Sequence, residues 1–176
     1  MISLQETLTD AGSPMTSPLD LARDRVLVLG FGYLVMGDAG VGIHILRQLE
    51  DEMPVQGVRL LGIGTGGACL PSEIESASDI VLIRAARNGE PAGTITFLQL
   101  GVFGELPRGL GVDDFGLKDL FSTLARMNPP PRFHQYAVAV EAMQPMSMEL
   151  SPAVAAAVPE VVQTVYALAT RLAAAA

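Results

Sequence analysis

The chain has 176 residues, of which 49% are hydrophobic, with a net charge of −8 at pH 7 and a single cysteine. This length and apolar content suit one domain with a sizeable core, and the acidic balance argues against nucleic-acid and anionic-membrane partners while permitting a basic protein or peptide. One cysteine cannot form an intramolecular disulfide, so a reducing cytoplasmic compartment is expected.

The first 24 residues are rich in Ser, Thr, Asp, Pro and Gly, with neither a basic n-region nor a continuous apolar stretch. Residues 1–24 are therefore interpreted as a flexible leader rather than a signal peptide, ahead of one domain over residues 25–176. The sequence nowhere reaches 18 consecutive apolar residues, which argues against a membrane span.

Strand and helix patterns alternate along the rest of the chain. Residues 26–29 carry no polar side chain, as is typical of a strand buried on both faces. Strands are predicted at 26–31, 57–63, 79–85, 94–100 and 133–140, and helices at 40–52, 67–77, 116–127 and 152–172. This alternation indicates βαβ units and a largely parallel sheet. The bend before residue 94 is too short for a parallel crossover, so the strand at 94–100 is expected to be an antiparallel edge.

The last predicted helix has a clear start signal. Ser151 is expected to be its N-cap and Pro152 its first residue, with Ala, Val and Leu spacing continuing to residue 172.

A glycine-rich turn follows the first strand, with glycines at 30, 32, 37, 40 and 42. Such a turn either lets the backbone approach a ligand at the strand's carboxyl end or simply joins the strand tightly to a helix. A dinucleotide site is disfavoured because Val35 stands at the third glycine of G-x-G-x-x-G and no acidic residue ends the next apolar run. No Walker sequence occurs.

A cysteine hydrolase is a further alternative, with Cys69 as the nucleophile and His44 or His134 as its base. His44 is more simply a partly exposed residue early in a helix. His134 is more simply a strand-edge residue with a satisfied ring.

The glycine turn resembles the N-terminal signature of the [NiFe]-hydrogenase maturation endopeptidases, G-x-G-N-x-L-x-x-D-(D/E)-G-x-G, at Gly30, Gly32, Leu34, Asp38, Gly40 and Gly42. Three further segments resemble that family in the right order. They are the glycine turn at 61–67, the strand and bend at 79–94, and the stretch at 138–152. Together the four segments cover about residues 26–172, which is far more specific than one glycine motif.

The resemblance implies a three-layer α/β/α sandwich around a twisted, mostly parallel five-stranded sheet with one antiparallel edge strand. It also implies removal of a C-terminal peptide from the hydrogenase large subunit, whose nickel is engaged by Glu, Asp and His ligands of the protease. At those three positions this chain carries Ala39, Arg84 and Asp113.

These substitutions change the expected chemistry. Alanine has no lone pair to donate, and an arginine repels a cation, while Asp113 alone offers oxygen, which favours Mg or Ca over nickel. No metal ligand set and no cofactor are therefore expected on this chain. Nickel is expected, on the partner subunit, only if the chain is a working endopeptidase.

Arg84 is hypothesised to fill the space of the missing metal and to pair with Asp113, Asp114 or Asp38. The predicted binding site also includes Ala39, Gly66 and Gly67. The alternative is that Arg84 extends into solvent from the strand end.

Two functions follow from this interpretation. The first is an accessory or binding factor for the [NiFe]-hydrogenase large subunit or its precursor that keeps the endopeptidase fold without cleaving peptide. The second is a working endopeptidase whose metal contacts come from Asp38, Asp113 and Asp114, or mainly from the substrate.

Overall fold

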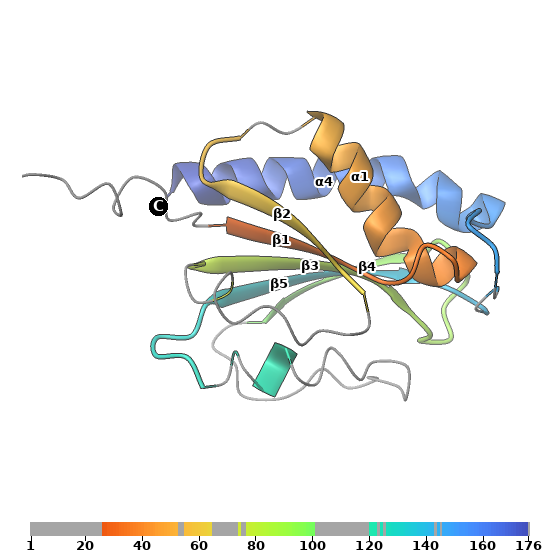
Figure 1. The fold of residues 1–176 in the computed structure, drawn as a ribbon, viewed down its shortest axis with the longest axis horizontal. Helices are drawn as coiled ribbons and strands as arrows, with labels where there is room; N and C mark the ends of the chain where they lie inside the picture. Colours follow the sequence, from red (N-terminus) through yellow and green to blue (C-terminus); the bar gives the residue numbers. More distant parts are fainter. Residues whose placement is uncertain are drawn as a thin grey trace, which may run out of the picture.

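The structure is a computed structural model that describes residues 26–52, 55–64, 74, 77–100, 120–122, 124, 126–142, 144 and 146–175. Its elements (Figure 1) are β1 (Val26–Phe31), the 3-10 helix η2 (Gly37–Gly40), α1 (Val41–Glu52), β2 (Val58–Ile63), β3 (Asp79–Ala86), β4 (Ile95–Leu100), β5 (Arg132–Ala139) and α4 (Pro152–Ala174). All five predicted strands are confirmed. The helices predicted at 67–77 and 116–127 lie largely outside the described residues, with helical backbone at 74, 120–122 and 124.

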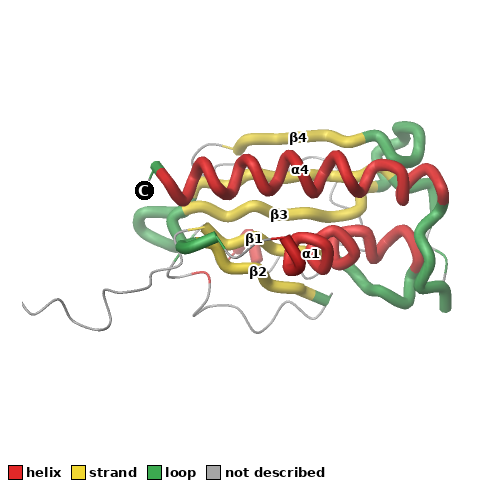
Figure 2. The backbone as a smooth tube through the Cα atoms, turned by 90° about the horizontal axis from the view of Figure 1, so that it is seen from above, coloured by secondary structure: helices red, strands yellow, loops and turns green. Residues whose placement is uncertain are grey.

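The five strands form one twisted sheet in the order β2-β1-β3-β5-β4 (Figure 2). The pairs β1–β2, β1–β3 and β3–β5 are parallel, and β4 pairs antiparallel with β5. The predicted antiparallel edge strand is therefore confirmed. Because β4 covers the outer side of β5, β5 is an interior strand of the sheet.

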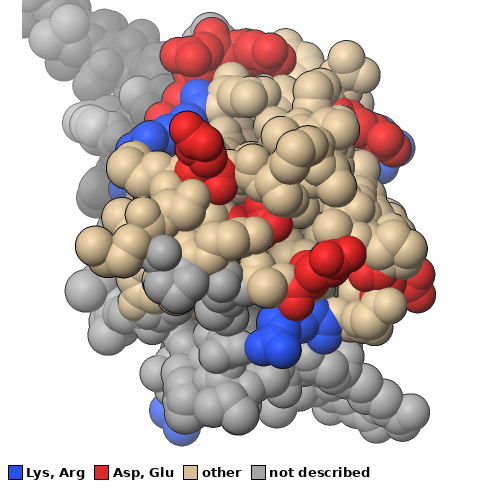
Figure 3. Space-filling model, turned by 90° about the vertical axis from the view of Figure 1, so that its right-hand side faces the viewer, with Lys and Arg blue, Asp and Glu red and all other residues tan. Residues whose placement is uncertain are grey.

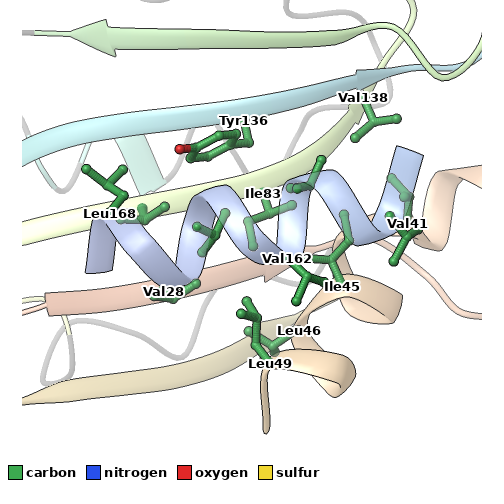
Figure 4. Close-up of a cluster of buried hydrophobic side chains, with 14 of the residues drawn as sticks. Val28, Val41, Ile45, Leu46, Leu49, Ile83, Tyr136, Val138, Val162 and Leu168 are labelled. Carbon is green, nitrogen blue, oxygen red and sulfur yellow. The ribbon is translucent and has the colours of Figure 1, made fainter. Parts of the chain in front are cut away.

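Helices α1 and α4 cover one face of the sheet, and residues 120–122 lie on the other (Figure 1). In the core cluster beneath the two helices, side chains of both helices point toward those of the strands (Figure 4). A second cluster on the opposite face joins β1 and β3 to Ile74, Phe121 and Leu124. The predicted three-layer α/β/α sandwich is confirmed.

Two glycines of the first turn allow α1 to pack directly on the sheet. A Cβ on Gly30 would lie 2.6 Å from the carbonyl oxygen of Gly42, and a Cβ on Gly42 would collide with the carbonyl oxygens of Phe31 and Ile83. A real Cβ cannot come this close to a backbone oxygen. The glycines at these two positions therefore set the distance between the first turn of α1 and strands β1 and β3.

Among the described residues, α4 is the one helix long and apolar enough to cross a membrane by length and composition. Helix α4 meets this criterion through its mean hydropathy and not through an unbroken apolar run. In the structure α4 buries one side, from Val154 to Leu172, against the sheet and α1. A core helix of this kind passes the same test, so the test is weak support for a membrane span.

Candidate functional site

In the sheet, β2 lies on one side of β1 and β3 on the other. The strand order therefore reverses direction between β1 and β3, and the topological switch point lies at their carboxyl ends. In open α/β sheets, ligands bind in the crevice outside the carboxyl ends of the strands at such a point. The glycine turn after β1 and the last residues of β3 therefore frame the candidate site. Figure 3 faces this edge of the molecule.

The backbone of the glycine turn needs glycine at two further positions. Gly32 has φ 143° and Gly37 has φ 55°, both in the region that side chains disfavour. A Cβ on Gly32 would also collide with the carbonyl oxygen of Ala39, and one on Gly37 would collide with the side chain of Gln144. The space next to the turn is thus filled by the protein's own atoms.

Asp38, the acidic residue that the family signature retains, is 2% exposed and hydrogen-bonded through both carboxylate oxygens. Its Oδ1 accepts a hydrogen bond from the backbone N–H of Ser151 at 2.6 Å. Its Oδ2 accepts one from Nε2 of Gln144 at 3.1 Å, and its own N–H donates to Oε1 of Gln144 at 2.9 Å. Both carboxylate oxygens are occupied by protein donors, so Asp38 fastens the turn to the segment before α4.

Ser151 is the N-cap of α4 and Pro152 its first residue, as predicted. However, the Ser151 hydroxyl makes no capping bond, and its buried Oγ has no hydrogen-bond partner. The carboxylate of Asp38 lies at this helix start instead. An anion near a helix N-terminus is favoured by the partial positive charge of the free N–H groups.

Further contacts join the same two segments. Met36 and Ser147 form a parallel β-bridge, and the N–H of Gly37 donates to the carbonyl oxygen of Ser147 at 2.7 Å. Sequence reasoning assigned no role to Gln144 or Ser147. The one signal that could have pointed to them is the need of a buried carboxylate for nearby donors.

Arg84 is 5% exposed on β3, opposite Ala137 of β5. Side chains alternate along a strand, so Arg84 shares the face of Leu82, which is the face away from α1 and α4. Its Nη1 donates to the carbonyl oxygen of Ala85 at 3.0 Å. The alternative in which Arg84 extends into solvent is therefore wrong.

The predicted partners of Arg84 have different outcomes. Among the described residues, the carboxylate of Asp38 is bonded to Gln144 and Ser151 and not to Arg84. Asp113 and Asp114 lie outside the described residues, so their pairing with Arg84 stays a prediction. The predicted site residues Gly66 and Gly67 also lie outside.

The described residues do not fit a bound cation at this site. The side chain of Ala39, in η2, is a methyl group with no ligand atom, and Arg84 carries a positive charge. Within the described ranges there is also no group of three or more His, Cys, Asp or Glu side chains that could hold a metal ion.

His134 is not the strand-edge residue that the sequence suggests, because it is buried in the interior strand β5. Its Nε2 lies 3.3 Å from Oδ1 of Asp79, and its ring stacks against Phe97. Asp79 is also held by Arg132 through two bonds of 2.7 Å. This cluster is at the amino ends of β3 and β5, away from the candidate site.

The remaining candidates for a cysteine hydrolase are His44 and Cys69. His44 is half-buried on α1, and burial, together with the cation of Arg47, lowers its pKa below the ordinary value. A lowered pKa keeps the ring neutral at pH 7. The proposed nucleophile, Cys69, lies outside the described residues.

An open depression of about 560 Å³ lies where the chain leaves β3 and β5. It is lined by Arg87, the turn at 89–91, Val140 and Glu141. It therefore adds charged groups of both signs to the carboxyl edge of the sheet.

Comparison with known proteins gives the family. The model of the hydrogenase maturation protease family matches residues 43–168. The hydrogenase expression/formation protein HoxM of Azotobacter vinelandii is 27% identical over 124 residues, which are 67% of this chain and 56% of that protein. HupD of Thiocapsa roseopersicina is 32% identical over 94 residues, 53% of this chain and 41% of HupD. The chain spans about half the length of these curated relatives.

Solved structures share the fold. The hydrogenase maturating endopeptidase HybD of E. coli superposes with a TM-score of 0.69 at 24% identity, covering 82% of this chain and 91% of HybD. The hydrogenase 2 maturation peptidase of a Thaumarchaeota archaeon gives 0.64 at 25% identity, covering 83% and 99%. Because the family model matches well over half of its residues, the chain belongs to the hydrogenase maturation protease family.

Proposed function

We propose that this chain is an accessory binding factor of [NiFe]-hydrogenase maturation, which engages the large subunit or its precursor in the cytoplasm without cleaving it. The observation that carries the proposal is the burial of Arg84 at the carboxyl end of β3. The family resemblance places a metal-ligating aspartate at this position.

The charge of Arg84 opposes the metal that the family handles. Like charges repel, so a divalent cation placed next to a guanidinium is disfavoured. Arginine stays protonated at any relevant pH. A nickel ion carried by the large subunit would therefore be repelled where the family would ligate it.

Asp38 supports the same proposal. Its carboxylate accepts hydrogen bonds from the N–H of Ser151 and the amide of Gln144, which join the glycine turn to the segment before α4. In this chain Asp38 therefore has a structural task, holding the turn in shape, that needs no cation.

Family membership favours one alternative, an active endopeptidase. In that case the metal contacts would come from Asp113 and Asp114 or mainly from the substrate.

The two functions are separated by mixing the purified chain with the nickel-loaded precursor of the large subunit. We expect a stable complex and no mobility shift of the precursor on a denaturing gel. A maturation protease with all three family ligands is the positive control, and the triple variant Ala39→Glu, Arg84→Asp, Asp113→His tests whether the family ligand set restores cleavage. Trimming by the wild-type chain would support the alternative and overturn the proposal.

A further inference from the structure

Exposed apolar side chains gather on two loops beside the switch point. Tyr33 (43% exposed) and Val35 (51%) lie on the turn after β1, and Met146 (94%) and Met148 (56%) lie on the segment before α4. The bridge between Met36 and Ser147 places the two loops side by side. These four side chains are here called the loop patch.

The loop patch is mounted on a well-connected backbone. Between its two halves run the reciprocal bonds of Asp38 and Gln144 and the bond from Gly37 N–H to the carbonyl oxygen of Ser147. A surface that is already ordered loses little conformational entropy when a partner binds. The loop patch is thus preorganised for contact.

Met146 has a backbone conformation that methionine disfavours. Its φ is 64°, and it follows Pro145 in a turn closed by Ser147 N–H donating to the carbonyl oxygen of Gln144 at 3.3 Å. The third position of such a turn favours glycine. The Met146 side chain itself is almost fully in solvent. Strain retained at an exposed position points to a role outside the folded chain.

The charge around the loop patch indicates what kind of partner fits. Glu141 and Glu149, on the same segment as the two methionines, are both exposed. On this face of the molecule, acidic side chains lie at several places around an uncharged area, with basic side chains beside some of them (Figure 3). The whole chain carries a net charge of −8. A complementary partner presents apolar side chains flanked by lysine or arginine.

We propose that the loop patch docks a segment of the maturation partner in which apolar side chains lie next to basic ones. This inference rests on the proposed function, because the partner is taken to be the large subunit or its precursor. Methionine side chains are flexible and polarisable, so they adapt to the surface of a partner segment. The patch lies at the same edge of the sheet as Arg84 and Asp38, so a docked segment reaches the candidate site.

The test is the dissociation constant of the wild-type chain and its variants for the large-subunit precursor of the same organism. Tyr33→Lys and Met148→Lys place a cation in the patch and are expected to weaken binding at least about tenfold, as is common for hot-spot residues. The matched control is Tyr166→Lys, since Tyr166 is 37% exposed on α4, outside the patch. It is expected to stay within about twofold of wild type.

Met146→Gly is a second test that does not add charge. It relieves the positive φ, so thermal stability should not fall, while the loss of the side chain should weaken binding by about fivefold or more. Weaker binding without lower stability distinguishes a docking role from a structural one.

Each other outcome overturns something specific. If wild type binds and the three patch variants bind equally well, the docking surface is wrong and the proposed function stands. If wild type does not bind the precursor, both are wrong. Light scattering gives the oligomeric state of both proteins. If wild type is a dimer, Tyr33→Lys is a monomer and precursor binding is unchanged, the patch is an interface between copies of this chain.

Discussion

The carboxylate of Asp38 accepts a hydrogen bond from the backbone N–H of Ser151 at 2.6 Å, although 113 residues separate them in the chain. This bond ties the glycine turn after β1 to the start of α4, the last helix in the chain. The acidic residue that the family signature retains therefore acts here as a tether between two distant segments.

Replacing Asp38 by alanine is expected to destabilise the protein by about 3 kcal/mol. The change leaves the N–H of Ser151 and the amide of Gln144, both part-buried, without their acceptor, and a donor left unsatisfied costs about 1–3 kcal/mol. Urea unfolding followed by circular dichroism measures the loss. Asp51→Ala, at an exposed position near the end of α1, is the control. A loss below about 1 kcal/mol for Asp38→Ala would contradict the tether.

Gly30 and Gly62 face each other in the register of β1 and β2 and form a matched pair. A Cβ on Gly30 meets the backbone oxygen of Gly42 at 2.6 Å, whereas one on Gly62 meets the flexible side-chain ends of Ile43 at 3.3 Å and Leu46 at 3.5 Å. Gly30→Ala should therefore cost about 2 kcal/mol or more, as overpacking against a backbone does, and Gly62→Ala should stay within about 1 kcal/mol of wild type. Equal effects in urea unfolding would show that α1 does not pack as described.

The stability of the protein should depend on pH through His44. Burial, with a further contribution from the cation of Arg47, lowers the pKa of His44 in the folded chain below the ordinary value of 6.5. The unfolded chain then binds a proton more readily, so the contribution is fully present above pH about 6.5 and is lost as the pH falls toward the folded pKa. The Nε2 atom of His44 is buried and has no hydrogen-bond partner, so a proton there would not be stabilised by an acceptor.

The measurement for His44 is urea unfolding at pH values between about 7.5 and 5.5. His44→Gln, which stays neutral throughout, should lose less stability over this interval than the wild-type chain. A wild-type profile parallel to that of His44→Gln would rule out the effect.

Nickel titration of the untagged protein by calorimetry should show no stoichiometric site tighter than about micromolar, which corresponds to about 8 kcal/mol of binding free energy. The physical reason is the pair of substitutions Ala39 and Arg84, of which one removes a ligand and the other adds a cation. The triple variant Ala39→Glu, Arg84→Asp, Asp113→His is the comparison and should bind more tightly. A tight site on the wild-type chain would mean that other residues hold the ion.

The strands and the sheet direction could be predicted from the sequence because their signals are local. An unbroken apolar run indicates a doubly covered strand such as β1, and the short bend before residue 94 rules out a parallel crossover. The start of α4 at Pro152 follows from its neighbours in the chain. The glycine positions and the substitutions Ala39 and Arg84 are likewise visible in the sequence.

The surroundings of individual side chains were decided only by the tertiary structure. The partners of Asp38 lie more than 100 residues away, and His134 is buried because β4 pairs on the outer side of β5. The loop patch exists only because residues 33–36 and 146–148 are brought together. The spacing of apolar residues and the positions of turn residues predict the conformation of the local backbone. Burial and hydrogen bonding depend instead on which distant segments the fold places side by side.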